Sequence, residues 1–312
     1  MILKKHASFF KIFLAIALLF IFLMFSSSAA DSAKNGIYRC INTVIPTLFP
    51  IFVINGLLIN SGAAYRITRI LARPIKKIFG IEGIGVYPTV IGLICGAPSG
   101  CIALSSMLEN DDIRREEASI IAVVSSPISF SFLYATVGAK MLASQKLGMI
   151  LYLIGVISSV ISGRIISSLI KNKTNKESIH RHSFSQNPSF SLSRAISGAV
   201  SSILSISGAI VFFSSLSGLI CAIPDIPFFV KAFSTIFLEI TSGAEAVTVH
   251  LSKASSFLFL CAGAGWSGLS IISQCLSAVG KKASLGLFLV GKCINSLISL
   301  LLGYLLTLFM SI

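Results

Sequence analysis

Charged residues are scarce in this 312-residue chain: they make up 12% of it, against 54% hydrophobic residues. A soluble domain carries about 25% charged residues, so this composition excludes an ordinary soluble fold. Acidic residues are the rarest charged class, at 11 against 25 basic ones. We therefore expect an all-α polytopic membrane protein in the lipid bilayer, whose basic loops set its orientation under the positive-inside rule.

The chain also lacks the motifs of common enzymes and metal sites. It has no Gly-x-x-x-x-Gly-Lys-Ser/Thr phosphate loop, no Gly-x-Ser-x-Gly nucleophile turn with His and Asp partners, and no nucleic-acid motif. None of its seven cysteines has a Cys-x-x-Cys or Cys/His spacing suited to zinc. We expect no enzymatic activity, no cofactor, no bound metal and no nucleic-acid partner. An intramembrane enzyme is a minor alternative.

Apolar runs divide the chain into two halves. Residues 41–170 and 195–312 each hold several runs long enough to cross a bilayer, which takes about 20 apolar residues in a helix. Residues 171–194 between them are rich in Ser, Asn, Lys and His. We expect a flexible cytoplasmic linker joining two membrane-embedded halves.

Residues 1–30 form a separate unit. Lys4 and Lys5 precede the apolar run Phe9–Phe25, and small residues follow it. Retained signal anchors and signal peptides that are cleaved after small residues share this order. The length of the run favours a retained transmembrane helix, and cleavage is the alternative.

Glycine and proline interrupt two apolar segments where a membrane helix should continue. The first break is Gly96–Gly100 and the second is Gly263–Gly268. Such breaks free backbone groups that lipid cannot satisfy, and paired breaks in two halves of a membrane protein indicate a transporter site. The alternative is close helix packing through small residues.

Two further segments are expected to turn back instead of crossing. Both loops around Val86–Leu108 look cytoplasmic, which favours a re-entrant hairpin, and Phe228–His250 is too polar at its centre for a simple crossing. An ionisable residue at bilayer depth costs about 2.5 kcal/mol or more, so Glu239 should face protein or water. It either carries a coupling proton or cation, or locks its hairpin through hydrogen bonds.

The basic loops assign each end of each span to one side of the membrane. This assignment predicts that the two halves are inverted around a central site.

The candidate substrate-binding residues lie at these interruptions and at the one in Ala118–Val137. Amino termini of half-helices carry partial positive charge and attract carboxylate or phosphate groups. Trp266, Ser270 and Gln274 are spaced four apart and predict a polar stripe on one helical face, with Trp266 either stacking on an aromatic ligand or packing in the interior. The full set is Gly96, Pro98, Ser99, Gly100, Ser125, Ser126, Pro127, Glu239, Thr241, Gly265, Trp266, Ser267, Gly268, Ser270 and Gln274.

Several of these motifs occur together in one order. They include Val44–Pro50, Gly96–Gly100, Leu238–Gly243 and Gly265–Ser270 with Gln274. In this order they resemble the sporulation integral membrane protein family (YlbJ-like) of the nucleoside-recognition or Gate domain group. The chain departs from that pattern by having Ala97 where the family is expected to have Tyr, and Ser126 where it is expected to have Asn.

The resemblance implies a role in endospore formation, with dipicolinate moved from the mother cell across the outer forespore membrane. We therefore expect a multi-pass protein of the bacterial cell membrane that transports a small organic anion by alternating access. The alternatives are a non-transporting scaffold of the spore envelope and a nucleoside transporter, since related Gate-domain proteins are associated with nucleosides.

Overall fold

The computed structural model describes residues 2–79, 81, 83–108, 115–171 and 190–309. These residues form helices joined by short turns, and no strand occurs among them. Five helices in the described ranges are long and apolar enough to cross a membrane: Ser26–Asn60, Gln145–Ile170, Leu192–Ala222, Lys253–Lys282 and Leu285–Phe309. The expected all-α polytopic membrane protein is confirmed.

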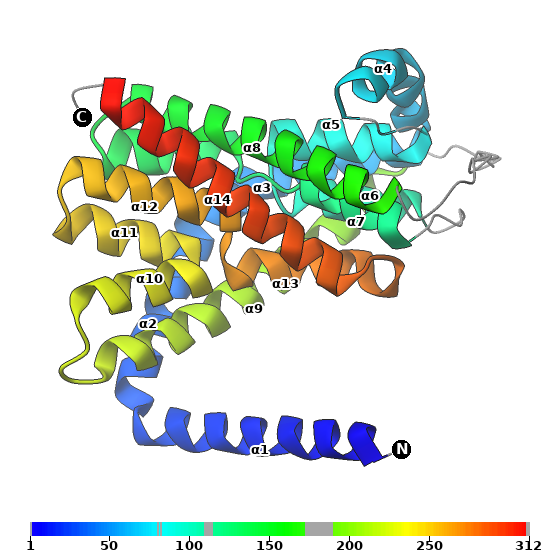
Figure 1. Ribbon diagram of the computed structural model, residues 1–312. Coiled ribbons are helices and arrows are strands. Elements are labelled where there is room, and N and C mark those ends of the chain that lie inside the picture. Colours follow the sequence, from blue (N-terminus) through cyan, green and yellow to red (C-terminus); the bar gives the residue numbers. More distant parts are fainter. Residues whose placement is uncertain (1, 80, 82, 109–114, 172–189, 310–312) are drawn as a thin grey trace.

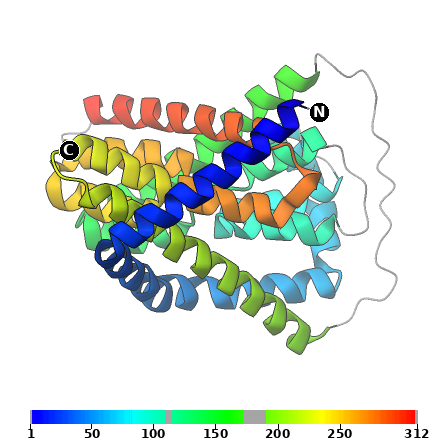
Figure 2. The same cartoon turned by 90° about the horizontal axis from the view of Figure 1, so that it is seen from below.

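The amino-terminal helix α1 (Ile2–Met24) lies apart from the bundle in Figure 1, and in the view from below in Figure 2 it runs across the bundle. Its described side chains are mostly exposed, and Phe22 stacks on Phe212 of α9 with ring centroids 6.2 Å apart. Such a helix suits an apolar surrounding. Whether α1 is retained or cleaved stays a prediction.

The second helix begins earlier than the apolar run indicates. The helix starts at Ser26, not near Ile41, and passes through α2 (Ser26–Arg39), the π-helical segment η1 (Cys40–Val44) and α3 (Ile45–Asn60). Polar α2 is held because its small residues let it approach α9 closely: a Cβ on Gly36 would lie 3.2 Å from Ser214. The π segment ends where Pro46, which has no N–H, interrupts the helical hydrogen bonds.

The first half continues through a surface helix and a hairpin. Its elements are α4 (Ala63–Phe79), η2 (Gly83–Gly85), α5 (Val86–Cys95), α6 (Ser99–Met107), α7 (Arg115–Val124), the π-helical η3 (Phe132–Met141) and α8 (Gln145–Lys171). Helices α5 and α6 pack side by side and turn at residues 96–98, so the predicted hairpin is confirmed. The interruption expected within Ala118–Val137 lies between α7 and η3.

The second half also runs from a long helix to a hairpin, an interrupted segment and a last long helix, without a counterpart to α4. Its elements are α9 (Leu192–Ala222), α10 (Phe228–Leu238), α11 (Ile240–His250), α12 (Lys253–Trp266), α13 (Gly268–Val279), η4 (Gly280–Lys282) and α14 (Leu285–Phe309). Helices α10 and α11 form the second predicted hairpin, with Glu239 at its tip, and α12 and α13 form an interrupted crossing with Ser267 between them. The two glycine-rich breaks are therefore of different kinds: the first is a hairpin tip and the second interrupts a crossing.

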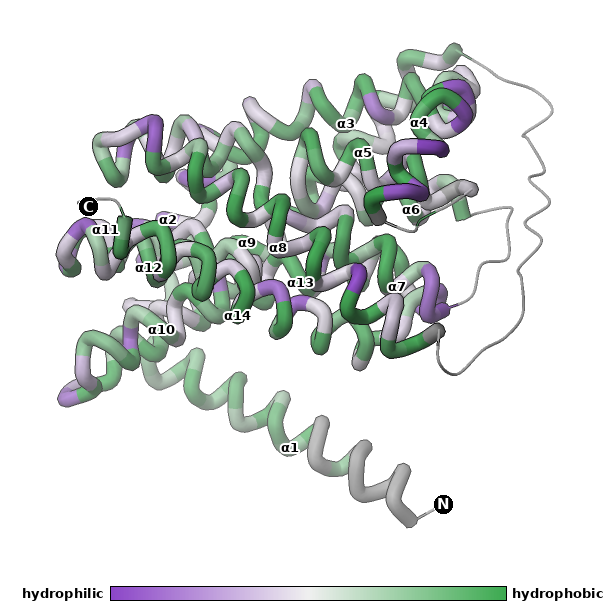
Figure 3. Tube along the Cα trace, turned by 45° about the horizontal axis from the view of Figure 1, so that its top comes forward, coloured by the Kyte–Doolittle hydropathy of each residue, from purple (hydrophilic) through white to green (hydrophobic). Residues whose placement is uncertain are grey.

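The two hairpins lie toward opposite ends of the bundle, α5 and α6 at one end and α10 and α11 at the other (Figure 1). The basic helix α4 lies at the α5–α6 end, and Figure 3 shows its hydrophilic residues. Arg115 also lies at that end, where its Nε donates to the Lys281 carbonyl at 2.7 Å. The predicted linker falls largely on residues 172–189, outside the described ranges.

Candidate functional site

The tip of the first hairpin is closed by backbone contacts. A Cβ on Gly92 or on Gly100 would clash with the Ser125 carbonyl oxygen. Beyond them, the Ala97 N–H donates to the Pro127 carbonyl at 2.6 Å. The hairpin thus lies backbone to backbone against the interruption after α7, where it satisfies a group that a broken helix would leave unpaired.

The tip of the second hairpin is closed by a carboxylate. Glu239 is 1% exposed and accepts from the Thr241 N–H at 2.9 Å, from the Ser242 N–H at 2.8 Å and from the Ser242 hydroxyl at 2.8 Å. The Thr241 hydroxyl also donates to it. Glu239 is the N-cap of α11, whose amino terminus favours negative charge. The sequence left two roles open for Glu239, coupling and locking of the hairpin. These hydrogen bonds are of the kind that locking requires.

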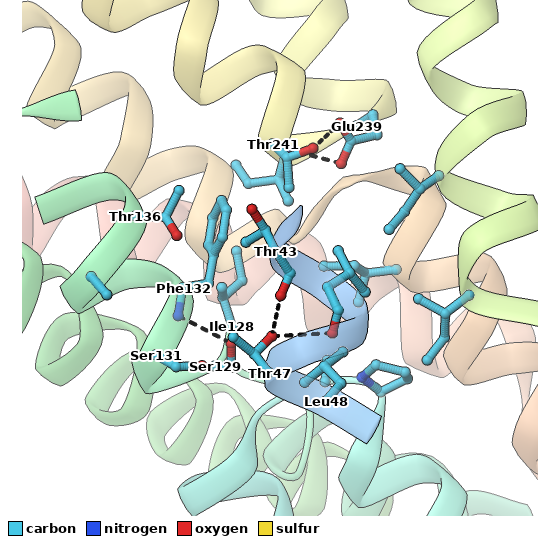
Figure 4. A pocket seen from close by; sticks show the side chains of 18 of the residues that line it. Thr43, Thr47, Leu48, Ile128, Ser129, Ser131, Phe132, Thr136, Glu239 and Thr241 are labelled. Carbon is cyan, nitrogen blue, oxygen red and sulfur yellow. Dashed lines mark hydrogen bonds between the residues drawn. The ribbon is translucent and has the colours of Figure 1, made fainter. Parts of the chain in front are cut away.

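A cavity of about 200 Å³, here called the central cavity, lies between the two tips. Its wall includes Ala97 and Pro98 from the first tip and Glu239, Ile240 and Thr241 from the second. The remaining wall comes from η1 and the start of α3, residues 128–140, α9 and α13. Figure 4 shows Thr43, Thr47 and Leu48 from the η1–α3 side, together with Glu239 and Thr241.

A second cavity of about 220 Å³ lies beyond Pro98. It is lined by α6, α9 and α13, and we call it the serine-lined cavity after its hydroxyl groups: Ser105, Ser106, Ser201, Ser202, Ser205 and Ser277. Three residues line both cavities: Pro98, Ile206 and Gln274. The Nε2 of Gln274 donates to the Ser270 hydroxyl at 3.2 Å, while its buried Oε1 has no hydrogen-bond partner.

Four of the predicted site residues line these cavities: Pro98, Glu239, Thr241 and Gln274. The others line neither, and all are buried except Trp266, which is partly exposed: Gly96, Ser99, Gly100, Ser125, Ser126, Pro127, Gly265, Trp266, Ser267, Gly268 and Ser270. Their role in substrate binding stays a prediction. Glycine and proline mark where a helix breaks, and the break is filled by packed backbone, so the wall comes from neighbouring side chains.

Trp266 packs against the second hairpin. Its Nε1 donates to the Phe237 carbonyl at 3.0 Å, and its ring stacks on Phe237 with centroids 4.9 Å apart. The predicted stripe through Trp266, Ser270 and Gln274 is wrong at its first member, because α12 ends at Trp266 and a new helix begins after Ser267.

Comparison with known proteins gives one relative. No family model and no solved structure matches the chain. Over 122 residues the chain is 26% identical to sporulation integral membrane protein YlbJ of Bacillus subtilis (strain 168), a match that covers 39% of this chain and 30% of that protein. The chain is a multi-pass membrane protein related to a sporulation integral membrane protein. The nucleoside-recognition or Gate domain assignment stays a prediction.

The sequence reasoning missed Lys292, the charged residue inside the apolar helix α14. Lys292 is 1% exposed, and its Nζ donates to the Ser126 carbonyl at 3.1 Å and to the Ser267 hydroxyl at 2.7 Å. One turn further on, Asn295 Nδ2 donates to the Gly265 carbonyl at 3.0 Å. The signal was present, since an ionisable residue within a membrane helix is rare and points to function.

The sequence reasoning also missed an ion pair beside the central cavity. Arg39, at the end of α2, bonds to the Glu245 carboxylate and the Ser242 hydroxyl of α11 at 2.7 and 2.8 Å. Because these residues are about 200 positions apart, no spacing rule could have paired them.

Proposed function

We propose that this protein is a carrier that moves a small, ring-sized organic anion across a membrane by alternating access, with dipicolinate as the first candidate. The observation that supports this most is the pair of cavities that meet at Pro98, Ile206 and Gln274. A solute that passes between the cavities must pass these three side chains. Gln274 is suited to meet it, because its Nε2 carries two N–H groups and the one that does not donate to Ser270 can donate to a carboxylate.

We infer that the two halves are inverted repeats. Each half runs through a crossing helix, a hairpin, an interrupted crossing and a last crossing, and the hairpins lie toward opposite ends (Figure 1). Rocking of two inverted repeats around a fixed site opens that site to one side of the membrane and then to the other.

The size of the central cavity favours one small ring as the solute. A dry cavity of about 150 Å³ is enough to hold benzene, and the central cavity has about 200 Å³. A planar ring with two carboxylates is close to this size. A base with an attached sugar is larger and needs a conformation of the protein with a wider cavity. We therefore place dipicolinate ahead of a nucleoside.

The charges around the central cavity are consistent with an anion. Lys140 lies in its wall, and the negative charge of Glu239 is already balanced by four hydrogen bonds at the start of α11. The amino terminus of α6, after Pro98, adds partial positive charge on the other side.

We infer that the basic end of the bundle faces the cytoplasm under the positive-inside rule. The serine-lined cavity lies toward this end, because it is lined by the later residues of α6 and α13 and by the first half of α9. The cell membrane, and in a sporulating cell the outer forespore membrane, is the location that we propose.

Uptake by purified protein in lipid vesicles tests the proposal. Vesicles with the wild-type protein should accumulate labelled dipicolinate, Gln274→Leu should reduce uptake strongly, and the control Ser273→Ala, which lines neither cavity, should not. Uptake of a nucleoside without dipicolinate would support the nucleoside alternative. No uptake of either solute by folded protein would favour the scaffold.

A further inference from the structure

Lys292 is buried where the interruptions of the two halves meet. Among the described residues, it and Glu239 are the charged side chains that are buried. Its bond to the Ser126 carbonyl reaches the interruption of the first half, and its bond to the Ser267 hydroxyl reaches that of the second. One ammonium group therefore bridges the two halves.

The backbone around Lys292 is arranged for a cation. Ser126 follows the carboxyl end of α7, and Ser267 is the C-cap of α12, between its last residue Trp266 and the start of α13. Carboxyl ends of helices carry partial negative charge, and in carriers with broken helices such ends and unwound carbonyls hold the coupling cation. The ammonium of Lys292 lies where that cation would be expected.

In the described part of the chain, Lys292 Nζ bonds to a carbonyl and a hydroxyl and not to a carboxylate. Of the helices packed against α14, α8 and α12 contain no acidic residue, and α7 has its acidic residues in its first turn, at the end away from Ser126. The basic residues of these helices are Lys146 and Arg164, both exposed, and Arg115, Lys253 and Lys171 at helix ends. The thiols of Cys101 and Cys275 are the titratable groups near Lys292.

We propose that Lys292 is the binding site of the coupling proton, so that this carrier is driven by protons and not by sodium. The inference rests on the proposed transport function. In the conformation described, the ammonium holds the two interruptions together. When the halves begin to move apart, the ammonium loses its hydrogen bonds to the Ser126 carbonyl and the Ser267 hydroxyl while the site is still largely dry. Without these acceptors the charged form is disfavoured, so the ammonium transfers one proton to a water molecule that enters the site and becomes a neutral amine. Protonation from the other side restores the bridge.

The single tryptophan offers a test that does not depend on transport, because Trp266 is the neighbour of Ser267. Fluorescence of the purified protein should show one transition with pH in the wild type. Lys292→Met and Lys292→Arg should both remove the transition, the first by deleting the titrating group and the second by keeping its charge permanently. Cys101→Ala, Cys275→Ala and the exposed control Lys146→Met should retain it.

Size-exclusion elution and thermal unfolding identify the variants that fold, and Lys292→Arg retains a charged donor if Lys292→Met does not fold. A transition that persists in a folded Lys292 variant, or a wild-type protein without any transition, would overturn the proposal.

Gradient-driven uptake then tests coupling. Coupling between two sites typically changes affinity about 5- to 150-fold, and we expect a pH gradient to stimulate wild-type dipicolinate uptake within this range while a sodium gradient does not. Lys292→Arg should lose this stimulation. Stimulation by sodium alone would overturn the proposal. A Lys292-dependent fluorescence transition without any uptake would instead overturn the transport function and leave the proton site standing.

Discussion

The two hairpin tips face one cavity but are closed by different means. The α5–α6 tip is closed by backbone: Gly92 and Gly100 leave no room for a side chain beside Ser125. The α10–α11 tip is closed by the Glu239 carboxylate, which the donors of its own hairpin surround. The first tip therefore requires residues without a side chain, and the second requires a negatively charged side chain.

This difference predicts that the tips fail in different ways. Added volume has nowhere to go where backbone lies against backbone, because both segments are fixed by their own hydrogen bonds. Loss of the carboxylate leaves space, but it also leaves buried donors without an acceptor. Substitutions that change either volume or charge separate the two cases.

The largest effect should come from volume at the first tip. Gly92→Leu should destabilise the protein by more than about 4 kcal/mol, since the new side chain meets the Ser125 carbonyl. Thermal unfolding and the yield of monodisperse protein measure this. The control is Gly155→Leu on α8, where a Cβ meets nothing within 4 Å. Equal losses at the two positions would contradict the backbone closure of this tip.

Loss of the carboxylate at the second tip should come next. Glu239→Ala removes an N-cap and the acceptor of four donors, at a cost of about 2–4 kcal/mol. Glu239→Gln keeps an acceptor of the same size and should cost less. Glu245→Ala, at an exposed carboxylate on the same helix, is the control for denaturation measured in detergent. A Glu239→Gln variant as stable as the wild type would show that charge is not what closes the tip.

The contact between the second hairpin and the interrupted crossing should have a smaller effect. Trp266→Phe keeps an aromatic ring over Phe237 but removes the donor to its carbonyl, which should cost about 1 kcal/mol. Trp266→Ala should cost about 2 kcal/mol, because the partly exposed ring is lost as well. Similar unfolding temperatures for the two variants would indicate that the ring does not contribute to stability.

The ion pair beside the second hairpin should have the smallest effect on stability. Arg39→Gln should cost at most about 1 kcal/mol, because Glu245 is 56% exposed and water screens the pair. The loss should shrink as salt is raised. Unfolding measured at low and high salt checks this, and a large loss that salt does not change would show that the pair is better shielded than its exposure indicates.

Much of the helical pattern could be read from the sequence. Apolar runs predicted the spans, and interruptions at Gly96–Gly100, Ser125–Pro127 and Glu239 marked the two hairpins and one broken crossing. This works because lipid offers no hydrogen bonds, so each interruption must be a place where protein satisfies the backbone. The early start of the second helix at Ser26 could not be predicted from apolar runs, because polar α2 is stabilised by packing on α9 and not by lipid.

By itself, then, the sequence determined that this is an all-α membrane protein and where its helices break. Only the tertiary structure decided which residues line the cavities and what Lys292 holds together. Glycine and proline act within a few residues of their own position, so their effect is visible in a linear pattern. A cavity or a buried ammonium depends on segments that are more than 100 residues apart, such as Ser126 after α7 and Lys292 in α14, and these meet only when the chain has folded.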